Sequence, residues 1–276
     1  MTLVWGIVNV TPDSFSDGGR YLDPAAAIAH GRMLRAQGAD VLDVGGESTR
    51  PGSEPVGAEE EIRRVVPVIE ALAADGASVS VDTYRAEVAR AALAAGARIV
   101  NDVSGGLAEP TILEVAAASG ADVALGHWRG PSADMYAKAE YDRIGAEVAR
   151  ELRERADAAL AAGVPRERII LDPGIGFAKA GAQNWTLLRE LDEVQRLGFP
   201  VLIGTSRKRF LGEVLGDDAS EARKDLATAV TSALAARRGL HAVRVHDVRS
   251  TRDAIAVVEA WEGPGRAVPT ERSETK

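Results

Sequence analysis

The stretch RIVNDVSGGLAEPTILEVAAASGADVAL, residues 98–125, contains one strand–helix–strand unit. Residues 98–101 and 122–125 are short runs dominated by apolar side chains, and 110–118 carry apolar residues at helical spacing after an opening proline. Gly120 follows at the point where a helix of this length should end. The pattern is typical of parallel strands buried on both faces and joined by a helix.

The same unit recurs along the whole chain. The apolar runs that predict strands are 3–10, 40–44, 78–81, 98–101, 122–125, 169–171, 201–204 and 242–245. The segments that predict helices are 24–37, 58–74, 84–95, 110–118, 138–162, 183–197, 220–238 and 250–260. The glycines expected to end helices are Gly38, Gly76, Gly96, Gly120, Gly163 and Gly198. Eight repeats with right-handed crossovers favour a single-domain α/β fold, the (β/α)8 TIM barrel.

An open doubly wound sheet is the alternative architecture. Such sheets usually have fewer strands and carry a glycine-rich fingerprint after the first one, whereas here the first strand runs into residues 9–13, Asn-Val-Thr-Pro-Asp. No linker divides the chain, so we expect residues 1–261 to form one barrel domain. Residues 262–276 are rich in Pro, Gly and charge, and we expect a flexible C-terminal tail.

Composition excludes several classes of function. The 276 residues include no cysteine, which rules out disulfides, thiolate catalysis and cysteine-bound zinc. A net charge of −8 argues against nucleic acid or an anionic membrane as partner. No apolar stretch reaches the roughly 20 residues needed to cross a bilayer, and the first apolar run lacks the basic flank of a signal peptide. We therefore expect a cytoplasmic protein.

Polar residues follow every expected strand, and in a TIM barrel these carboxyl ends meet at one mouth that holds the active site. The residues concerned are Asn9, Glu47, Ser48, Thr49, Arg50, Asp82, Thr83, Asn101, Asp102, His127, Arg129, Asp172, Ser206, Arg207, Lys208, Arg244 and His246. Structural roles are favoured for Asp40, Asp43 and Asp102, because Asp often caps helices and braces loops, and also for His30 and His241.

The assortment of side chains indicates the ligand. Asp82, Asp172 and Asn101 together with a lysine suit a planar heterocycle that has both donors and acceptors on its edge. Arg50, Arg244 and His246 suit a polyanion such as a diphosphate, with Asn9 as a neutral oxygen ligand for Mg²⁺. No Ser/His/Asp triad and no zinc-binding spacing is present, so we expect catalysis by positioning and charge.

Two long segments rich in Gly, Ser and Pro follow the first two strands, at 11–19 and 45–57. Barrel turns without a function tend to be short. The two segments are therefore interpreted as lids that fold over the substrate and exclude water.

The chain resembles the dihydropteroate synthases from about Trp5 to Trp261. The motifs that carry the resemblance, in family order, are G-I-V-N-V-T-P-D-S-F-S-D-G-G (6–19), D-V-G-G-E-S-T-R-P-G (43–52), S-V-D-T (80–83), N-D-V-S-G-G (101–106), L-D-P-G-I-G-F (171–177), S-R-K-R-F-L-G (206–212) and R-V-H-D-V (244–248). The resemblance implies an enzyme that couples 6-hydroxymethyl-7,8-dihydropterin diphosphate to 4-aminobenzoate with Mg²⁺, and it implies a homodimer.

The resemblance also implies a division of roles among three groups of residues. The pterin edge would be held by Asp82, Asn101, Asp172 and Lys208, with Phe177 in the pocket wall. The diphosphate and its Mg²⁺ would be held by Asn9, Arg50, Arg244 and His246. The 4-aminobenzoate would be framed by Thr49, Pro51, Ser206, Arg207 and Phe15, with Asp17 closing the first lid. A dissociative mechanism follows, in which diphosphate leaves first and the aromatic amine captures a carbocation.

One position departs from the family. The fifth strand ends in A-L-G-H-W-R (124–129), and Gly126 stands where the family usually has a methionine that packs in the pterin pocket. The smaller residue predicts a gap or extra backbone freedom there, and with it an altered pterin affinity.

Two other functions share parts of the pattern. A corrinoid-linked methyltransferase that binds a methylated folate would have similar Asp and Asn strand ends but would not need Arg50, Arg244 and His246. A non-catalytic paralogue that binds pterin would not need to keep the lid residues and Lys208.

Overall fold

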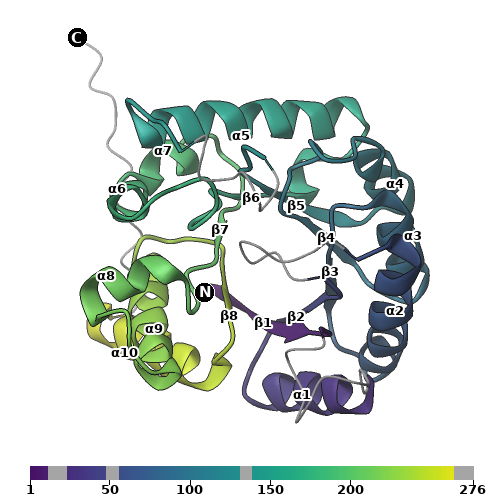
Figure 1. The fold of residues 1–276 in the computed structure, drawn as a ribbon, viewed down its shortest axis with the longest axis horizontal. Coiled ribbons are helices and arrows are strands. Elements are labelled where there is room, and N and C mark those ends of the chain that lie inside the picture. Colours follow the sequence, from purple (N-terminus) through teal and green to yellow (C-terminus); the bar gives the residue numbers. More distant parts are fainter. Residues whose placement is uncertain (12–23, 48–55, 131–138, 264–276) are drawn as a thin grey trace.

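A computed structural model describes residues 1–11, 24–47, 56–130 and 139–263. Within them, eight parallel strands form a ring with helices outside it, as expected from the sequence (Figure 1). The strands are β1 (Leu3–Asn9), β2 (Val41–Gly45), β3 (Val79–Asp82), β4 (Ile99–Asp102), β5 (Asp122–Gly126), β6 (Ile169–Asp172), β7 (Leu202–Ile203) and β8 (Ala242–Val245). They follow the order β6-β5-β4-β3-β2-β1-β8-β7, and a parallel bridge between Leu171 and Val201 links β6 to β7. The (β/α)8 prediction is confirmed, and the open-sheet alternative is wrong.

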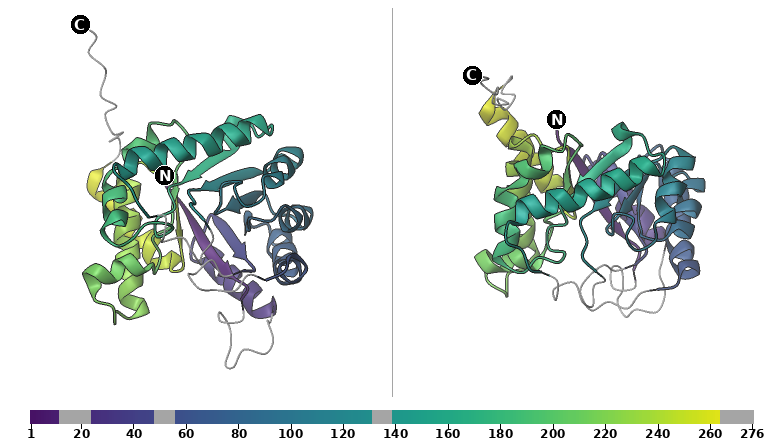
Figure 2. Two further views of the ribbon diagram at one scale, coloured as in Figure 1. Left: turned by 45° about the horizontal axis from the view of Figure 1, so that its top comes forward. Right: turned by 90° about the horizontal axis from the view of Figure 1, so that it is seen from above.

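The helices form the outer layer around the strands (Figure 2). They are α1 (Pro24–Ala36), α2 (Ala58–Ala74), α3 (Ala86–Ala94), α4 (Thr111–Ser119), α5 (Ile144–Ala161), α6 (Ala182–Arg189), α7 (Leu191–Gln195), α8 (Gly212–Leu215), α9 (Glu221–Arg237) and α10 (Val248–Glu262), with short 3-10 turns at Arg166–Arg168 and Arg209–Leu211. All six glycines expected to end helices have positive φ, for example 67° at Gly120. No helix in the described ranges is long and apolar enough to span a membrane.

Two helices begin or divide differently from the sequence expectation. Helix α5 begins at Ile144 and not at 138, because the Glu147 carboxylate accepts the backbone N–H groups of Asp142 and Arg143, at 2.8 Å each, and so caps the helix there. The segment 183–197 forms two helices, α6 and α7, that meet at Glu190.

The strands have an inner and an outer buried face. The apolar side chains that fill the lower barrel interior are Trp5, Val41, Ile99, Ala124, Ile170, Leu202 and Ala242. The alternate residues, such as Leu42, pack outward against the helices. Because side chains alternate along a strand, the positions two residues further along also face inward. This alternation places Asp43, Asp172 and Arg244 inside the barrel, near its carboxyl-terminal mouth.

Candidate active site

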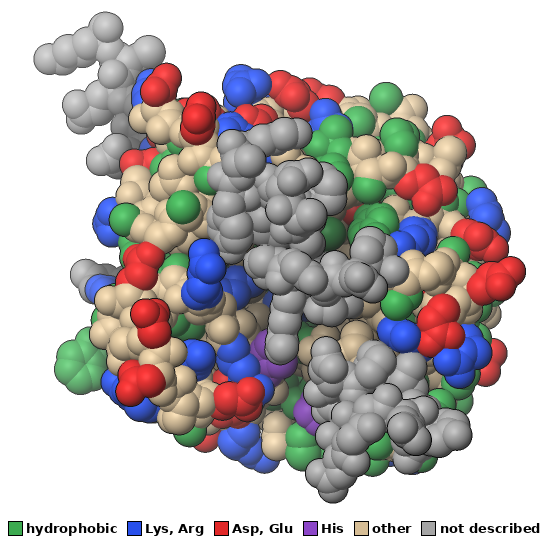
Figure 3. Space-filling model, viewed as in Figure 1, with side chains coloured by type: hydrophobic (Ala, Val, Ile, Leu, Met, Phe, Trp, Pro, Cys, Tyr) green, Lys and Arg blue, Asp and Glu red, His purple; other side chains and the backbone are tan. Residues whose placement is uncertain are grey.

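An ion-pair cluster centred on Arg244 lies inside the mouth. The Arg244 guanidinium donates through Nε to Asp43 and through a terminal nitrogen to Asp82, the latter at 2.7 Å. Asn101 Nδ2 donates to the same Asp43 carboxylate at 3.1 Å. Four strands, β2, β3, β4 and β8, therefore bring their polar ends together here. In the space-filling view of this face, His and Lys or Arg side chains are visible near the centre (Figure 3).

The electrostatics of this cluster make Asp82 sensitive to pH near neutrality. Burial raises the pKa of Asp82 to about 7, and the attraction of Arg244 only partly offsets this. Burial opposes the charge of Arg244, but the Asp43 and Asp82 carboxylates outweigh it and raise the Arg244 pKa. The guanidinium thus stays charged and compensates the buried Asp43 and the half-buried Asp82.

The sequence-based interpretation of Asp43 as a loop brace is wrong, since its carboxylate is fully buried and bonds to Arg244 and Asn101. The same interpretation is confirmed for Asp102, which accepts from the backbone of Ser104 at 2.8 Å and of Gly106 at 2.6 Å. Asp40 also has the structural role expected of it, since it accepts from the backbone of Val4 in β1 at 2.7 Å.

A second cluster faces the first across the mouth. Asp172 ends β6, and its Oδ1 accepts from the backbone of Gly174 at 2.7 Å. Lys208 donates to the carbonyl of Ile175, and its Nζ lies 4.5 Å from the centre of the Phe177 ring. Burial raises the pKa of Asp172, against the effect of Lys208. Burial lowers the pKa of Lys208 to about 8, against the effect of Asp172.

The Ser206 hydroxyl orients His246 beside these clusters. Ser206 Oγ accepts from the backbone N–H of His246 at 3.0 Å and lies 2.8 Å from His246 Nδ1. A hydroxyl that donates to Nδ1 leaves the ring proton on Nε2, which can then donate to an anion. Arg207 has a φ of 56°, and its guanidinium pairs with Asp225 at 2.7 Å and with Glu221 at 2.9 Å, both on the side of α9.

Asn9 ends β1, paired in register with Gly45. Within the described part of the chain, no group of three or more His, Asp or Glu side chains could hold a metal. Mg²⁺ commonly binds through one or two protein oxygens plus substrate phosphates and water. A single amide oxygen at the mouth therefore fits a Mg²⁺ that arrives with a diphosphate, and it does not fit a metal site made by protein alone.

Five of the expected site residues lie outside the described residues, namely Phe15, Asp17, Thr49, Arg50 and Pro51. Described residues near the two ends of the second expected lid are braced. The Glu47 carboxylate accepts from Tyr84 Oη at 2.6 Å, from Arg85 at 2.8 Å and from the backbone of Val56 at 3.0 Å.

Comparison with known proteins settles the family. A family model described as pterin binding enzyme matches residues 5–246. The dihydropteroate synthase of Mycobacterium leprae is 50% identical over 276 residues, which covers 98% of this chain and 97% of that one. The chain belongs to the dihydropteroate synthase family. The resemblance drawn from the sequence motifs is thereby confirmed. The prediction that the protein is an enzyme of the transferase class is confirmed as well.

Solved structures of the family agree with the fold. A dihydropteroate synthase from Xanthomonas albilineans with 4-aminobenzoic acid superposes with a TM-score of 0.88 at 47% identity, covering 96% of this chain and 94% of that one. The Xanthomonas albilineans enzyme in complex with 7,8-dihydropteroate superposes with a TM-score of 0.85 at 45% identity, covering 96% and 95%.

At Gly126 the structure corrects the expectation of a gap. A Cβ added at Gly126 would lie 2.4 Å from the carbonyl oxygen of Val103 and 2.8 Å from its Cα. The backbone after β4 therefore fills the space that a side chain would take. Gly126 is paired in register with Asp172, so this backbone borders the Asp172 side of the pocket.

Gly126→Met is accordingly expected to weaken pterin binding in this chain. The new side chain would have to displace the 103–106 backbone, and overpacking of this kind typically costs about 1–3 kcal/mol. Calorimetric titration with 6-hydroxymethylpterin and thermal unfolding measure both effects. Equal or tighter binding by the variant would show that the loop yields without cost.

A polar network behind the second cluster was not predicted from the sequence. Lys179, His127 and Glu151 form a continuous hydrogen-bonded chain from the β6–α6 loop to helix α5. Strand-end position did point to His127, but nothing in the sequence marks Lys179 or Glu151 as its partners.

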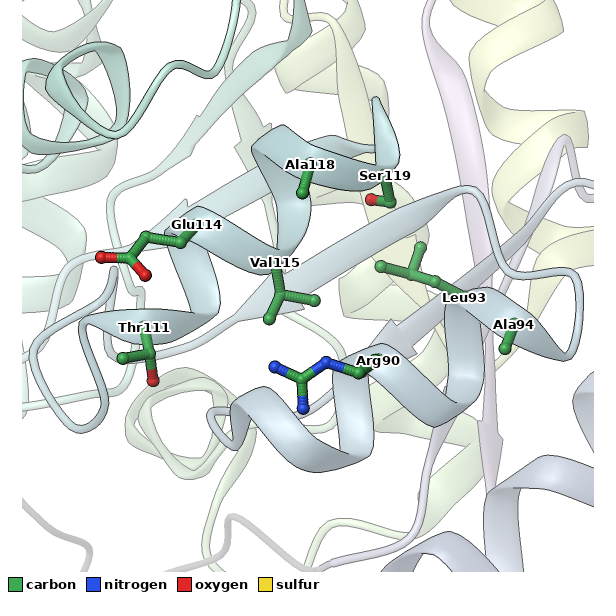
Figure 4. A pocket seen from close by; sticks show the side chains of 8 residues that line it. All are labelled: Arg90, Leu93, Ala94, Thr111, Glu114, Val115, Ala118 and Ser119. Atoms are coloured by element: carbon green, nitrogen blue, oxygen red, sulfur yellow. The ribbon is translucent and has the colours of Figure 1, made fainter.

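A surface groove lies away from this site. A groove of 620 Å³ opens between α3 and α4 on the outer ring, lined by Arg90, Leu93, Ala94, Thr111, Glu114, Val115, Ala118 and Ser119 (Figure 4). It is far from the strand ends and contains no cluster of catalytic groups. The site is assigned to the mouth of the barrel because of the polar side chains there and the register of the strands, and not because of the size of a groove.

Proposed function

We propose that this chain condenses 6-hydroxymethyl-7,8-dihydropterin diphosphate with 4-aminobenzoate to give 7,8-dihydropteroate and diphosphate. One observation carries the proposal: two half-buried acids, Asp82 and Asp172, converge with Asn101, Lys208 and Arg244 at one end of the barrel. The named relatives and the Xanthomonas complexes with 4-aminobenzoic acid and 7,8-dihydropteroate support it.

The donor and acceptor pattern of the second cluster complements a pterin edge. Asp172 presents a carboxylate to the amidine-like N–H groups of the ring, while the Lys208 ammonium can donate to ring oxygen or nitrogen. Phe177 supplies an apolar surface beside Lys208. Asn101 adds a neutral donor and acceptor from β4.

The Arg244 cluster suits the departing diphosphate. Arg244 is held by Asp43 and Asp82. A diphosphate beside it would add a third anionic partner, and His246 would add an N–H donor from the position fixed by Ser206. Preorganised donors of this kind stabilise charge as it develops on a leaving group.

The reaction then needs no protein nucleophile. The C–O bond to the diphosphate breaks, and its electron pair leaves with the diphosphate. The electron-rich dihydropterin stabilises the resulting carbocation at the exocyclic methylene, helped by the nearby Asp82 charge. The neutral amine of 4-aminobenzoate attacks that carbon, forms the new C–N bond and releases one proton, so no strong general base is required.

Mg²⁺ would be held by Asn9 together with oxygens of the diphosphate. When bound it would neutralise part of the diphosphate charge. The chain's own contribution is to orient the diphosphate through Arg244 and His246. Thr49, Pro51, Phe15 and Asp17, with Arg50 on the anion, complete the proposed substrate contacts, and Ser206 and Arg207 would frame 4-aminobenzoate.

The test is an assay of the purified protein with dihydropterin diphosphate, 4-aminobenzoate and Mg²⁺. Mg²⁺-dependent formation of dihydropteroate with one equivalent of diphosphate is expected. Absence of both products from a folded protein would overturn the proposal. Release of diphosphate without 4-aminobenzoate coupling would contradict the assignment of the second substrate.

A bell-shaped pH profile is expected for kcat/KM with dihydropterin diphosphate. Asp82, with a pKa of about 7, must be ionised to pair with Arg244 and to stabilise positive charge, so the rate should fall as pH drops below that value. Lys208, with a pKa of about 8, must be protonated to donate, so the rate should fall above it. Lys208→Arg should remove the alkaline limb of the remaining activity. A flat profile from pH 6 to 9 would contradict both roles.

We also propose a cytoplasmic homodimer that forms through α9 and α10, which pack against each other (Figure 1). Exposed apolar side chains stand one turn apart on α9 at Leu226, Val230 and Leu234, and on α10 at Val257 and Trp261. Several exposed apolar side chains grouped on two neighbouring helices are typical of an interface. A patch that is complementary to itself forms a dimer with two-fold symmetry. Sedimentation of Val230→Asp should show monomer where the unmodified chain shows dimer.

A further inference from the structure

The loop between β6 and α6 forms one wall of the proposed pterin pocket. It carries Phe177, and it supplies the Ile175 carbonyl that accepts from Lys208. Its backbone is unusual, because Ala178 has a φ of 49°, in the left-handed region that non-glycine residues rarely adopt. Such a conformation persists only where the surroundings determine it.

Lys179 lies beneath the loop and helps to hold it in this conformation. Its side chain is 1% exposed. The ammonium Nζ donates to the carbonyls of Gly174 at 3.1 Å and Phe177 at 2.9 Å, and it lies 2.9 Å from His127 Nδ1. Three acceptors match the three N–H bonds of an ammonium group. Burial lowers the pKa of Lys179 well below its usual value, against the charge of Asp172, and the loop is folded around this buried amino group.

His127 connects Lys179 to helix α5 of the outer layer. Burial and then the charge of Lys179 lower the pKa of His127 to about 4, so the ring is neutral and accepts at Nδ1. Its Nε2 donates to Glu151 on α5 at 2.9 Å. Glu151 is held in turn by Arg129 at 2.6 Å, and the His127 backbone N–H donates to the carbonyl of Asp172 at 2.9 Å.

Two neutral groups secure neighbouring points of the same loop. Asn184 Oδ1 accepts from the backbone of Gly176 at 2.7 Å, and Tyr141 Oη donates to the carbonyl of Ala178 at 3.0 Å. Neither of them reaches the Gly174 and Phe177 carbonyls, which are held by Lys179. These two carbonyls flank Ile175, whose own carbonyl points to Lys208.

We propose that Lys179 is a positioning residue for the pterin site. By turning the Gly174 and Phe177 carbonyls inward it presents the Ile175 carbonyl to Lys208 and sets the Phe177 ring beside the pocket. It touches no substrate, and its contribution is to build the wall before the ligand arrives. The inference rests on the proposed function for the identity of the ligand.

Lys179→Met tests this role, because methionine keeps the length of the side chain and removes the charge and the three donors. The Kd for 6-hydroxymethylpterin, measured by calorimetry, is expected to rise about 10-fold or more, since the Phe177 carbonyl loses the Lys179 donor and the Gly174 carbonyl keeps only the Phe177 N–H. The KM for 4-aminobenzoate is expected to change less than about 2-fold, because the loop faces the pterin side. Lys224→Met, on α9 and outside every contact described for the site, is the matched control and should leave both constants unchanged.

A folded Lys179→Met protein with an unchanged pterin Kd would overturn the proposal, as would an equal loss of affinity for both substrates. Hydrogen exchange on the unmodified, ligand-free protein gives a second test that does not depend on how the variant folds. The Gly176 and Phe177 amides should exchange slowly, and exchange as fast as in an unstructured peptide would overturn a preformed wall. If the unmodified chain bound no pterin at all while these amides were protected, the proposed function would fail and the anchoring role of Lys179 would stand.

Discussion

Asp172→Asn is expected to lower kcat/KM for dihydropterin diphosphate roughly 1,000-fold while the protein stays folded. Hydrogen bonds to a charged group contribute about 1.5–3 kcal/mol each, and the carboxylate can accept two from the pterin. The amide keeps one oxygen, which the Gly174 N–H already uses at 2.7 Å. Its NH2 group would then face the N–H donors of the ring. Two donors repel each other, so the hydrogen bonds that the carboxylate accepted would be lost. Lys208 would also lose its neighbouring charge, which lowers its pKa further below about 8.

Steady-state kinetics and calorimetric pterin binding measure the effect, with thermal unfolding as the check on the fold. Asp122→Asn is the matched control, since Asp122 begins β5 at the opposite end of the barrel. It is expected to retain the activity of the unmodified chain. An Asp172→Asn protein within about 10-fold of normal kcat/KM would show that the carboxylate does not bind the pterin edge.

The barrel could be predicted because its signals are local. Each strand is a short, largely apolar run, and the six glycines expected to end helices all have positive φ, as at Gly120. The start of α5 could not be placed in this way, because it depends on the Glu147 carboxylate folding back to cap Asp142 and Arg143. Tertiary contacts of that kind leave no periodic pattern.

The site was predictable only where position alone determines it. Asp82, Asn101, Asp172 and Arg244 follow apolar runs, and the barrel brings those ends together. Asp43 lies within its strand, yet the alternation from Val41 already places it on the inner face. Lys179 is different, since two of its acceptors come from a loop whose conformation the sequence does not show, and the third is the His127 ring after β5.

Arg244→Met is expected to destabilise the protein by about 3–5 kcal/mol at neutral pH, in addition to abolishing turnover. Arg244 is the cation that compensates both Asp43 and Asp82, which lie in the barrel interior. Without it two carboxylates remain close together in a poorly solvated space. The loss should therefore exceed that of any surface ion pair, such as the one between Arg63 and Glu60.

The size of this loss should depend on pH in a fixed direction. The pKa of Asp82 is already raised to about 7 with Arg244 present, and removing the guanidinium raises it further. A carboxyl whose folded-state pKa lies above its unfolded value binds a proton more readily when folded, so stability falls as pH rises through that interval. Urea unfolding of Arg244→Met should show a large deficit at pH 8 that shrinks towards pH 5.

The double variant Arg244→Met/Asp43→Asn separates charge from packing. Removing one of the two acids relieves their repulsion, so the double variant should be more stable at pH 8 than Arg244→Met alone, although Asp43→Asn by itself removes a partner of Arg244. Arg63→Met, at an exposed pair, is the control and should behave as the unmodified chain at both pH values. If Arg244→Met were equally destabilised at pH 5 and pH 8, or if Asp43→Asn gave no recovery, the loss would come from a packing defect. Arg244 would then not be the counterion of the barrel mouth.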